Sequence, residues 1–262
     1  MERLGSLSAF LPARNEEANL LPMARAVLDV LPDVADAWEL IIVDDGSRDG
    51  TGAIADALAR REPGVRVVRH RRSGGYGAAL RAGVRAARYD FVFYTDADRQ
   101  FDVAQLPVLI RELDRADVVV GYRYARADPL PRRLSAAAWN RLVRRLFRLP
   151  VRDVNCAFKL FRRSVLAGLR LETDGATIST EIMARLGAAG ARIVEVPVDH
   201  FPRRHGAPSG GELAVIARAF VELAHLRRHL RDEPARDERR RGAERLRNGT
   251  RPAGRRPPPM PA

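Results

Sequence analysis

The sequence predicts an α/β fold in which a mostly parallel central sheet is flanked by helices. Short apolar runs of strand length recur along the chain, segments with helical spacing lie between them, and polar clusters follow several of the runs. Strands that alternate with helices are typical of a parallel sheet covered on both faces. At 262 residues, the chain is long enough to bury the core of one large domain.

The strand candidates are rich in β-branched or aromatic residues. Four of them cover residues 7–11, 40–43, 65–68 and 91–94, and two more cover 118–122 and 192–198. Between the first four, apolar side chains share one helical face over residues 17–31, 50–60 and 78–87. We expect a C-terminal helix after the last strand.

A basic amphipathic helix is predicted over residues 132–149. Four apolar residues fall on one face and arginines occupy much of the rest: Leu134, Ala138, Leu142 and Leu146, against Arg141, Arg144, Arg145 and Arg148. Such a helix either lies in the plane of a membrane surface or packs on the sheet as an ordinary surface helix. Both interpretations stay open.

The composition changes after residue 231. Residues 232–262 are rich in Arg, Pro and Gly and have almost no large apolar groups, so they cannot bury enough surface to offset the entropy of ordering. The sequence therefore predicts a folded domain over residues 1–231 and a disordered basic tail over residues 232–262.

The charge and cysteine content bound the environment and the partners. The formal net charge is +13, and all basic side chains except Lys159 and the histidines are arginines, which suit anionic partners such as sugar nucleotides, lipid phosphates or membrane headgroups. No specific nucleic-acid site is expected. The lone Cys156 excludes an internal disulfide framework and favours a reducing setting. No signal peptide or spanning segment is evident, so we expect a cytoplasmic protein, soluble or peripheral on the inner face of the cell membrane.

Polar loops follow the first two strand candidates. In the first loop, Arg14 and Glu16 could reach a nucleotide, or Asn15 could cap the next helix. In the second, Asp44 or Asp45 could accept hydrogen bonds from a base or ribose, or the segment could be a turn that caps a helix.

Two aspartates, Asp96 and Asp98, follow the fourth strand candidate with one alanine between them. Carboxylates so close together can face one cation, and oxygen ligands suit Mg²⁺ or Mn²⁺. Such a cation can neutralise a diphosphate leaving group. The glycines of the segment 74–77 predict a tight turn or a close backbone approach, since they do not follow the first strand as a dinucleotide fingerprint would.

Six segments occur in the order and spacing of family 2 glycosyltransferases. They are LPARNEE, VDDGSRDGT, GGYGAAL, DADRQ, DVNCAFKLFRR and EVPVDHFPRRHG, and they span about residues 6–210. The chain most resembles the dolichol-phosphate and polyprenyl-phosphate branch. The resemblance implies a GT-A fold, a nucleoside-diphosphate-sugar donor of the GDP-mannose or UDP-glucose type, Mg²⁺ or Mn²⁺, and inversion at the anomeric carbon.

The resemblance also implies roles for single residues. On the donor side, the nucleoside contacts would be Pro12, Arg14, Glu16 and Asp44, with Asp45 and Ala97 beside the donor. Asp96 and Asp98 would hold the metal and the diphosphate, with Gln100 as a third ligand. Arg123 would lie near a donor or acceptor phosphate, Asp153, Asn155 and Lys159 would close over the sugar, and Arg204 would lie on a mobile loop near the diphosphate.

The acceptor is expected to be a polyprenyl phosphate. A hydroxyl acceptor needs a general base, whereas a lipid phosphate is already largely ionised near neutral pH. No Glu-Asp pair follows Asp153, as it does in many hydroxyl-transferring relatives. The alternatives are a transferase with a soluble saccharide or metabolite acceptor and a non-catalytic nucleotide-sugar-binding protein. Glu181 could be a base or a structural acid, His205 a loop residue or a ligand, and Cys156 is expected to pack.

Overall fold

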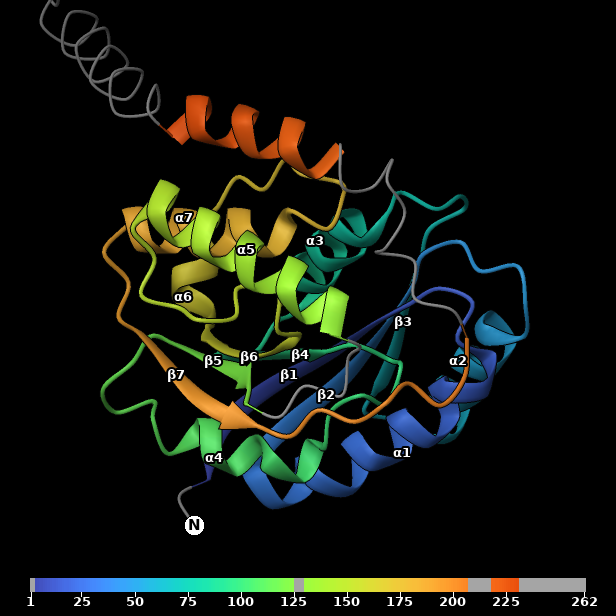
Figure 1. Cartoon of the computed structure of the whole chain (residues 1–262). Coiled ribbons are helices and arrows are strands. Elements are labelled where there is room, and N and C mark those ends of the chain that lie inside the picture. Colours follow the sequence, from blue (N-terminus) through green and yellow to red (C-terminus); the bar gives the residue numbers. More distant parts are fainter. Residues whose placement is uncertain (1–2, 125–129, 207–217, 231–262) are drawn as a thin grey trace, which may run out of the picture. The chain divides into compact units, whose positions relative to one another are not determined.

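The computed structural model describes residues 3–124, 130–206 and 218–230, with side chains from residue 133 in the second range. Within the described residues, the chain forms seven strands, seven α-helices labelled α1 to α7, one short 3₁₀-helix and a further helical segment after β7 (Figure 1). The strands are β1 Leu4–Ala13, β2 Ala35–Asp44, β3 Val65–Arg69, β4 Phe91–Thr95, β5 Val118–Arg123, β6 Phe158–Arg162 and β7 Ile193–Val198. The helices are α1 Glu17–Val34, α2 Thr51–Arg61, α3 Tyr76–Ala86, η1 Val103–Gln105, α4 Leu106–Ile110, α5 Leu130–Phe147, α6 Arg163–Leu166 and α7 Ile178–Ala188. Residues 218–230 are also helical.

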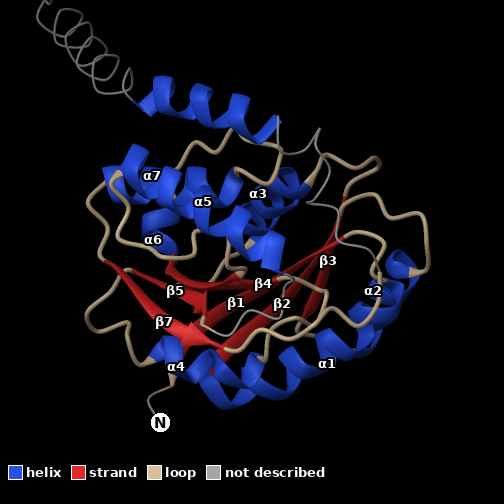
Figure 2. Ribbon diagram, in the orientation of Figure 1, coloured by secondary structure: helices blue, strands red, loops and turns tan. Residues whose placement is uncertain are grey.

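The seven strands form one sheet in the order β3-β2-β1-β4-β6-β5-β7. Strand β6 pairs antiparallel with both β4 and β5, and every other pairing is parallel. Helices α3, α5, α6 and α7 lie on one side of this sheet, and α1 and α4 lie on the other (Figure 2). The sheet is therefore buried on both faces, which explains why its central strands read as continuous apolar runs.

The core is built across the central strands. On one face, the ring of Tyr94 stacks against Phe10 at 5.2 Å and against Phe161 at 6.1 Å, which joins β1, β4 and β6. Helix α3 approaches this row closely at Gly83, where an added Cβ would lie 2.4 Å from the Phe10 ring. A larger residue at position 83 would push the helix off the sheet.

The predicted α/β architecture is confirmed, and each predicted strand is present. Strand β6 was not predicted, because its residues FKLFR carry charges at two of five positions and the strand runs antiparallel to its neighbours. The basic helix predicted over 132–149 is observed as α5 from Leu130 to Phe147. Its second half packs on the core through Val143, which is fully buried, whereas Leu134 is exposed.

The chain divides by its internal contacts into Met1–Leu223 and Ala224–Ala262, and the sheet and all the loops at its edges belong to the first unit. The predicted boundary at residue 231 and the predicted disordered tail lie outside the described residues. Among the described residues, no helix has the length and apolarity needed to cross a membrane.

Candidate active site

The topology gathers the polar loops at one edge of the sheet. Strands β1, β2, β4, β5 and β7 run in one direction, so their carboxyl ends share this edge. Strand β6 runs the other way, so the segment that enters it, residues 153–157, arrives at the same edge. Ligands of open α/β sheets bind outside the carboxyl ends of the strands. The separate sequence segments predicted to form the site therefore lie together at this edge of the sheet.

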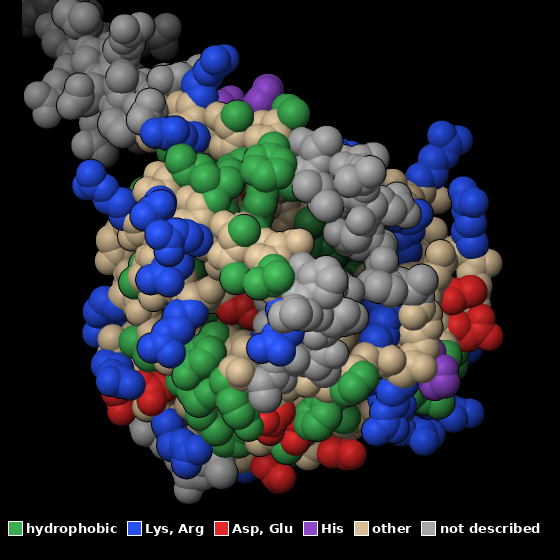
Figure 3. Space-filling view, viewed as in Figure 1, with side chains coloured by type: hydrophobic (Ala, Val, Ile, Leu, Met, Phe, Trp, Pro, Cys, Tyr) green, Lys and Arg blue, Asp and Glu red, His purple; other side chains and the backbone are tan. Residues whose placement is uncertain are grey.

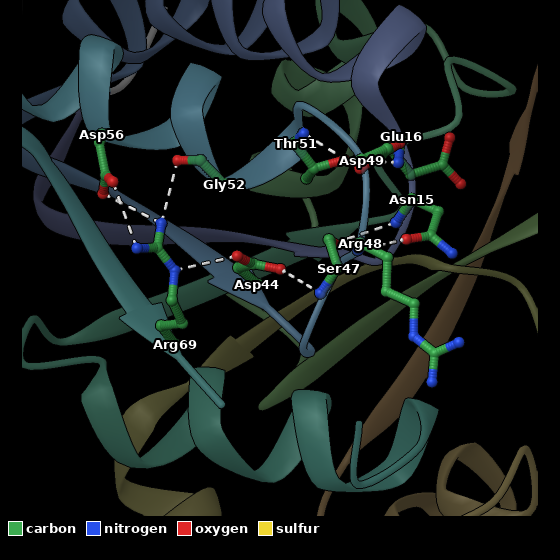
Figure 4. A network of polar contacts seen from close by, with 10 residues as sticks. All are labelled: Asn15, Glu16, Asp44, Ser47, Arg48, Asp49, Thr51, Gly52, Asp56 and Arg69. Atoms are coloured by element: carbon green, nitrogen blue, oxygen red, sulfur yellow. Dashed lines mark hydrogen bonds and ion pairs between the residues drawn. The ribbon is translucent and has the colours of Figure 1, made fainter. Parts of the chain in front are cut away.

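The first loop is fastened to the second through Asn15 and Glu16. The backbone N–H of Arg48 donates to the Asn15 side chain at 2.9 Å, and the N–H of Asn15 donates to the Ser47 hydroxyl at 3.0 Å (Figure 4). The N–H of Glu16 donates to the Thr51 hydroxyl at 2.8 Å. Asn15 therefore ties two loops together, and Glu16, not Asn15, occupies the cap position of α1. Arg14 is exposed.

Asp44 is the last residue of β2, and its buried carboxylate is paired with an arginine. One oxygen accepts the N–H of Ser47 at 2.9 Å, and the other accepts Nε of Arg69 at 3.0 Å. Arg69 also donates to Asp56 and to the carbonyl of Gly52 (Figure 4). Because the carboxylate is fixed from two directions, its position is set before any donor arrives.

Asp45 binds the glycine-rich turn that begins at Ser73, and its predicted contact with the donor stays a prediction. Its carboxylate accepts from the Ser73 hydroxyl at 2.7 Å, from the N–H groups of Gly74 at 2.9 Å and Gly75 at 3.0 Å, and it pairs with His70 at 2.7 Å. Burial raises its pKa, but these hydrogen bonds outweigh that effect and leave the pKa below its ordinary value. The residue therefore holds the glycine-rich turn, and Gly75 has the positive φ of 93° that such a turn needs.

Asp96 and Asp98 follow β4 at the centre of this edge. The Tyr76 hydroxyl donates to Asp96 at 2.8 Å, and the N–H of Gln100 donates to Asp98 at 3.1 Å. Loss of hydration and the charge of Asp98 raise the pKa of Asp96 to about 7, and burial also raises the pKa of Asp98. The two carboxylates repel each other in this enclosed setting, so a bound cation would relieve their charge.

The arginine that contacts Asp98 is Arg203. Its guanidinium lies 3.5 Å from the Asp98 carboxylate and forms an ion pair with Glu16, while its Nε donates to the carbonyl of His205 at 2.7 Å. Arg204, the arginine predicted from the sequence, is exposed. Neighbouring side chains leave the backbone in different directions, so motif position alone could not choose between them.

The segment 199–206 crosses the site and holds Gln100. The side-chain amide of Gln100 donates to the carbonyl of Phe201 at 3.1 Å, and the N–H of Phe201 donates to the carbonyl of Gln100 at 2.9 Å. This bond ties Gln100 to the crossing segment, and its predicted place as a third metal ligand stays a prediction. The His205 side chain is exposed, which fits the interpretation of a loop residue.

Arg123 and Asp153 form a two-pronged ion pair on the far side of the acidic cluster. Nε and Nη2 of Arg123 donate to the two oxygens of Asp153 at 2.6 and 2.8 Å, and the side chains are 13% and 8% exposed. Glu195 on β7, which the sequence analysis did not single out, accepts the N–H groups of Arg152 at 2.6 Å and Asp153 at 3.2 Å. It thereby fixes the segment that carries Asp153.

Lys159 is buried in β6, with only 1% of its surface exposed. Its ammonium donates to the Tyr94 hydroxyl at 3.2 Å, to the carbonyl of Val154 at 3.1 Å and to the carbonyl of Cys156. It thus holds the segment 153–157 from beneath, and its contacts are structural. Cys156 is fully buried, as expected, and burial raises the pKa of its thiol to about 12. Asn155 is exposed.

Glu181 is a structural acid. It is buried in α7, where it accepts Nε of Arg185 at 2.9 Å and the N–H groups of Glu172 and Thr173 at 3.1 and 2.8 Å. With its oxygens engaged in this way, it holds the segment before α7 and is not placed to act as a base.

The donor set fits a hard divalent cation. Among the described residues, no group of three or more His, Cys, Asp or Glu side chains could hold a metal, so a cation at Asp96 and Asp98 would have at most these two carboxylates as ligands from that part of the chain. Mg²⁺ commonly takes one or two carboxylates and completes its shell with water and substrate phosphates. Asp96 and Asp98 could supply the two carboxylates of such a magnesium site.

The chain's fold is the GT-A fold of glycosyltransferases. A crystal structure of glucosyl-3-phosphoglycerate synthase from Mycobacterium tuberculosis, in complex with Mn²⁺, UDP and phosphoglyceric acid, matches it with a TM-score of 0.65. The match covers 85% of this chain and 78% of that one at 21% sequence identity. The chain belongs to glycosyl transferase family 2, whose model matches residues 8–170, and the protein is a glycosyltransferase.

Two relatives whose names mention a polyprenyl phosphate also match the chain. The dodecaprenyl-phosphate galacturonate synthase of Rhizobium johnstonii is 32% identical over 224 residues, which cover 84% of this chain but only 65% of that protein. The undecaprenyl-phosphate mannosyltransferase of Micrococcus luteus is 30% identical over 226 residues, which cover 81% of this chain and 90% of that protein.

Proposed function

We propose that this protein moves a sugar, with inversion, from a nucleoside-diphosphate sugar to a polyprenyl phosphate. The observation that carries the proposal is that Arg203 pairs with both Glu16 and Asp98, which lies close to Asp96 in the chain, at the sheet edge where Asp44 also ends its strand. The names of the two polyprenyl-phosphate relatives support the acceptor class.

The donor would lie along the loops after β1, β2 and β4. Asp44 and Glu16 are set on the nucleoside side. Arg203 can shift from the carboxylates of Glu16 and Asp98 to the diphosphate, where a guanidinium pairs well with phosphate oxygens. Asp96 and Asp98 would hold Mg²⁺ or Mn²⁺, which when bound supplies positive charge to the leaving diphosphate. Gln100 and Pro12 are proposed as neighbours of the same site.

The acceptor side fits an attacking group that needs no base. Both oxygens of Asp153 are engaged by Arg123, so this carboxylate is poorly placed to take a proton from a hydroxyl. A phosphate monoester is largely ionised near neutral pH, since its second pKa is about 6. Its oxygen would form the bond to the anomeric carbon as the bond from that carbon to the diphosphate oxygen breaks, and the electron pair leaves with the nucleoside diphosphate.

The surface near this side suits a lipid-borne acceptor. In the described part of the chain, five large apolar side chains are exposed: Tyr124, Leu134, Phe201, Phe220 and Val221. Figure 3 shows hydrophobic side chains gathered over α5 and near the end of β7, with arginines along the adjoining flank. Apolar side chains rimmed by arginine fit the surface of an anionic membrane. We therefore propose peripheral binding at the cytoplasmic face of the membrane.

The test is a transfer assay with labelled UDP-glucose and GDP-mannose and two acceptors, undecaprenyl phosphate and 3-phosphoglycerate. We expect metal-dependent label in the organic phase with the lipid acceptor. Transfer to phosphoglycerate alone would replace the lipid acceptor with a soluble one, and intact donor turnover in the Asp98→Asn variant would overturn the metal assignment. Arg170→Ala, at an exposed residue away from these loops, is the control.

A further inference from the structure

A cavity lies at the edge of the sheet opposite the catalytic loops. It encloses about 330 Å³ between the end of α3 and the segment that begins with α6. Helix α3 starts at the catalytic edge and runs back across the sheet, and α6 follows the far end of β6, where the N–H of Arg163 donates to the carbonyl of Asp90 at 2.7 Å. Figure 2 shows α3 and α6 on the same face of the sheet. The volume is within the range of small-molecule pockets.

The cavity combines three arginines with an apolar wall. Arg81, Arg85 and Arg163 line it, together with apolar side chains that include Val84, Leu166 and Leu171. Nε of Arg163 donates to the carbonyl of Ala87 at 3.2 Å, and Arg81 is paired with Asp174. Arg85 forms no ion pair or hydrogen bond with another described residue, and no carboxylate lines the cavity. The cavity therefore has an excess of positive charge beside apolar surface.

This combination selects a class of ligand. Guanidinium groups bind phosphate and carboxylate through paired hydrogen bonds, and the aliphatic wall gains from burying a short hydrocarbon group. A cavity of this volume accepts a small ligand but not a macromolecule. The matching chemistry is a small amphiphilic anion, such as a phosphate monoester of a short alkyl group.

Arg81 connects the cavity to the metal carboxylates. Besides its ion pair with Asp174, it donates to the carbonyl of Thr173. The carbonyl of Asp174 accepts the N–H of Gly77 at 2.8 Å, and Cβ atoms added at Gly75 or Gly77 would lie within 2.6 Å of this segment. Tyr76, between these glycines, donates to Asp96. An anion that draws Arg81 away from Asp174 would therefore loosen the start of α3, about 14 Å along the helix from Arg85.

We propose that this cavity is an effector site for a small amphiphilic anion, and that its occupation weakens metal binding at Asp96 through Arg81 and Asp174. The site is separate from the proposed donor and acceptor positions. Its ligand binding can be measured without metal, sugar nucleotide or turnover, so failure of the proposed transferase reaction would leave the test intact.

The test uses titration calorimetry of the full chain with n-hexyl phosphate in EDTA, followed by Mn²⁺ titrations with and without saturating n-hexyl phosphate. We expect Arg85→Glu to weaken n-hexyl phosphate binding at least tenfold, because it removes a charge-assisted contact and adds repulsion. Arg170→Glu makes the same charge change at an exposed neighbour that does not line the cavity, and should change binding less than about twofold. Inorganic phosphate and n-hexanol should each bind at least tenfold more weakly.

Equal weakening by Arg85→Glu and Arg170→Glu would overturn the site, as would equal binding of inorganic phosphate and n-hexyl phosphate, since either result indicates general surface charge. Competition by UDP without metal would place the ligand at the donor edge and would also overturn it. Saturating n-hexyl phosphate should weaken Mn²⁺ binding at least about threefold, with reciprocal weakening of n-hexyl phosphate by Mn²⁺. Unchanged Mn²⁺ affinity would overturn the coupling through Arg81.

Discussion

The two halves of the catalytic edge are held together differently. Around β1 and β2, each loop is fixed by several hydrogen bonds from backbone groups nearby, such as those from Arg48 to Asn15 and from Gly74 and Gly75 to Asp45, in addition to the ion pair at the end of β2. Around β5, β6 and β7, buried ion pairs and a buried lysine do this work, as in Arg123 with Asp153 and in Lys159. The donor half is thus shaped in advance, whereas the acceptor half depends on a few charged side chains that single substitutions can remove.

The largest effect should come from the centre, where the halves meet. Asp98→Asn removes one of two carboxylates proposed to hold the metal, and should lower kcat/KM roughly 10³-fold, because metal stabilisation of a leaving group contributes several kcal/mol. Initial rates over a Mn²⁺ series would measure it. An unchanged rate with an unchanged Mn²⁺ requirement would contradict the assignment.

A smaller loss of activity is expected from substitutions in the segment 199–206. The size of this loss should differ between the neighbouring residues Arg203 and Arg204. Arg203→Ala should lower kcat roughly 10²-fold, as does removal of one group that stabilises developing charge, whereas Arg204→Ala should change it less than about threefold. Steady-state kinetics of the two variants would decide between them. A larger loss of kcat in Arg204→Ala than in Arg203→Ala would restore the assignment of Arg204 made from its position in the sequence.

The acceptor half should be the more fragile half in stability. Lys159→Met keeps much of the side-chain volume but leaves the carbonyls of Val154 and Cys156 without their buried donor. We expect a loss of about 2–3 kcal/mol in the free energy of unfolding, measured by urea denaturation. Ser47→Ala, which removes one exposed hydrogen bond from the N–H of Asn15 in the donor half, should cost less than about 1 kcal/mol. Equal losses would remove the contrast between the halves.

The smallest expected effect is the dependence of stability on pH. The folded pKa of Asp96 is about 7, above its ordinary value of 3.8, so the metal-free folded state binds more protons than the unfolded state between these values. Stability should therefore fall as pH rises from about 4 to about 7 and level off above that. The Asp96→Asn variant should have a shallower slope in thermal or urea unfolding. Added Mn²⁺ should stabilise the wild type increasingly as pH rises, because its ligands must lose their protons.

The sequence predicted the donor half better than the acceptor half, and the topology explains the difference. Acidic clusters such as Asp44 and Asp96 directly follow apolar runs, and parallel strands must bring those positions to one edge. On the acceptor side, β6 runs antiparallel to its neighbours. Lysine usually lies at the protein surface, but Lys159 of this strand is buried. The contact of Arg203 with Glu16 joins positions far apart in sequence, and no local pattern signals it.

The reversed strand has a consequence for how this molecule could change. Because β5 and β6 are antiparallel neighbours, the chain departs from the sheet after Arg123 and re-enters it at Phe158 on the same side, with α5 in between. Exchange of that excursion for a longer or shorter one leaves the strand register untouched, and each doubling of its length costs only about 0.6 kcal/mol in closure entropy. Under the proposed function, a change at this one junction would alter the acceptor side while the loops proposed to hold the nucleotide keep their places.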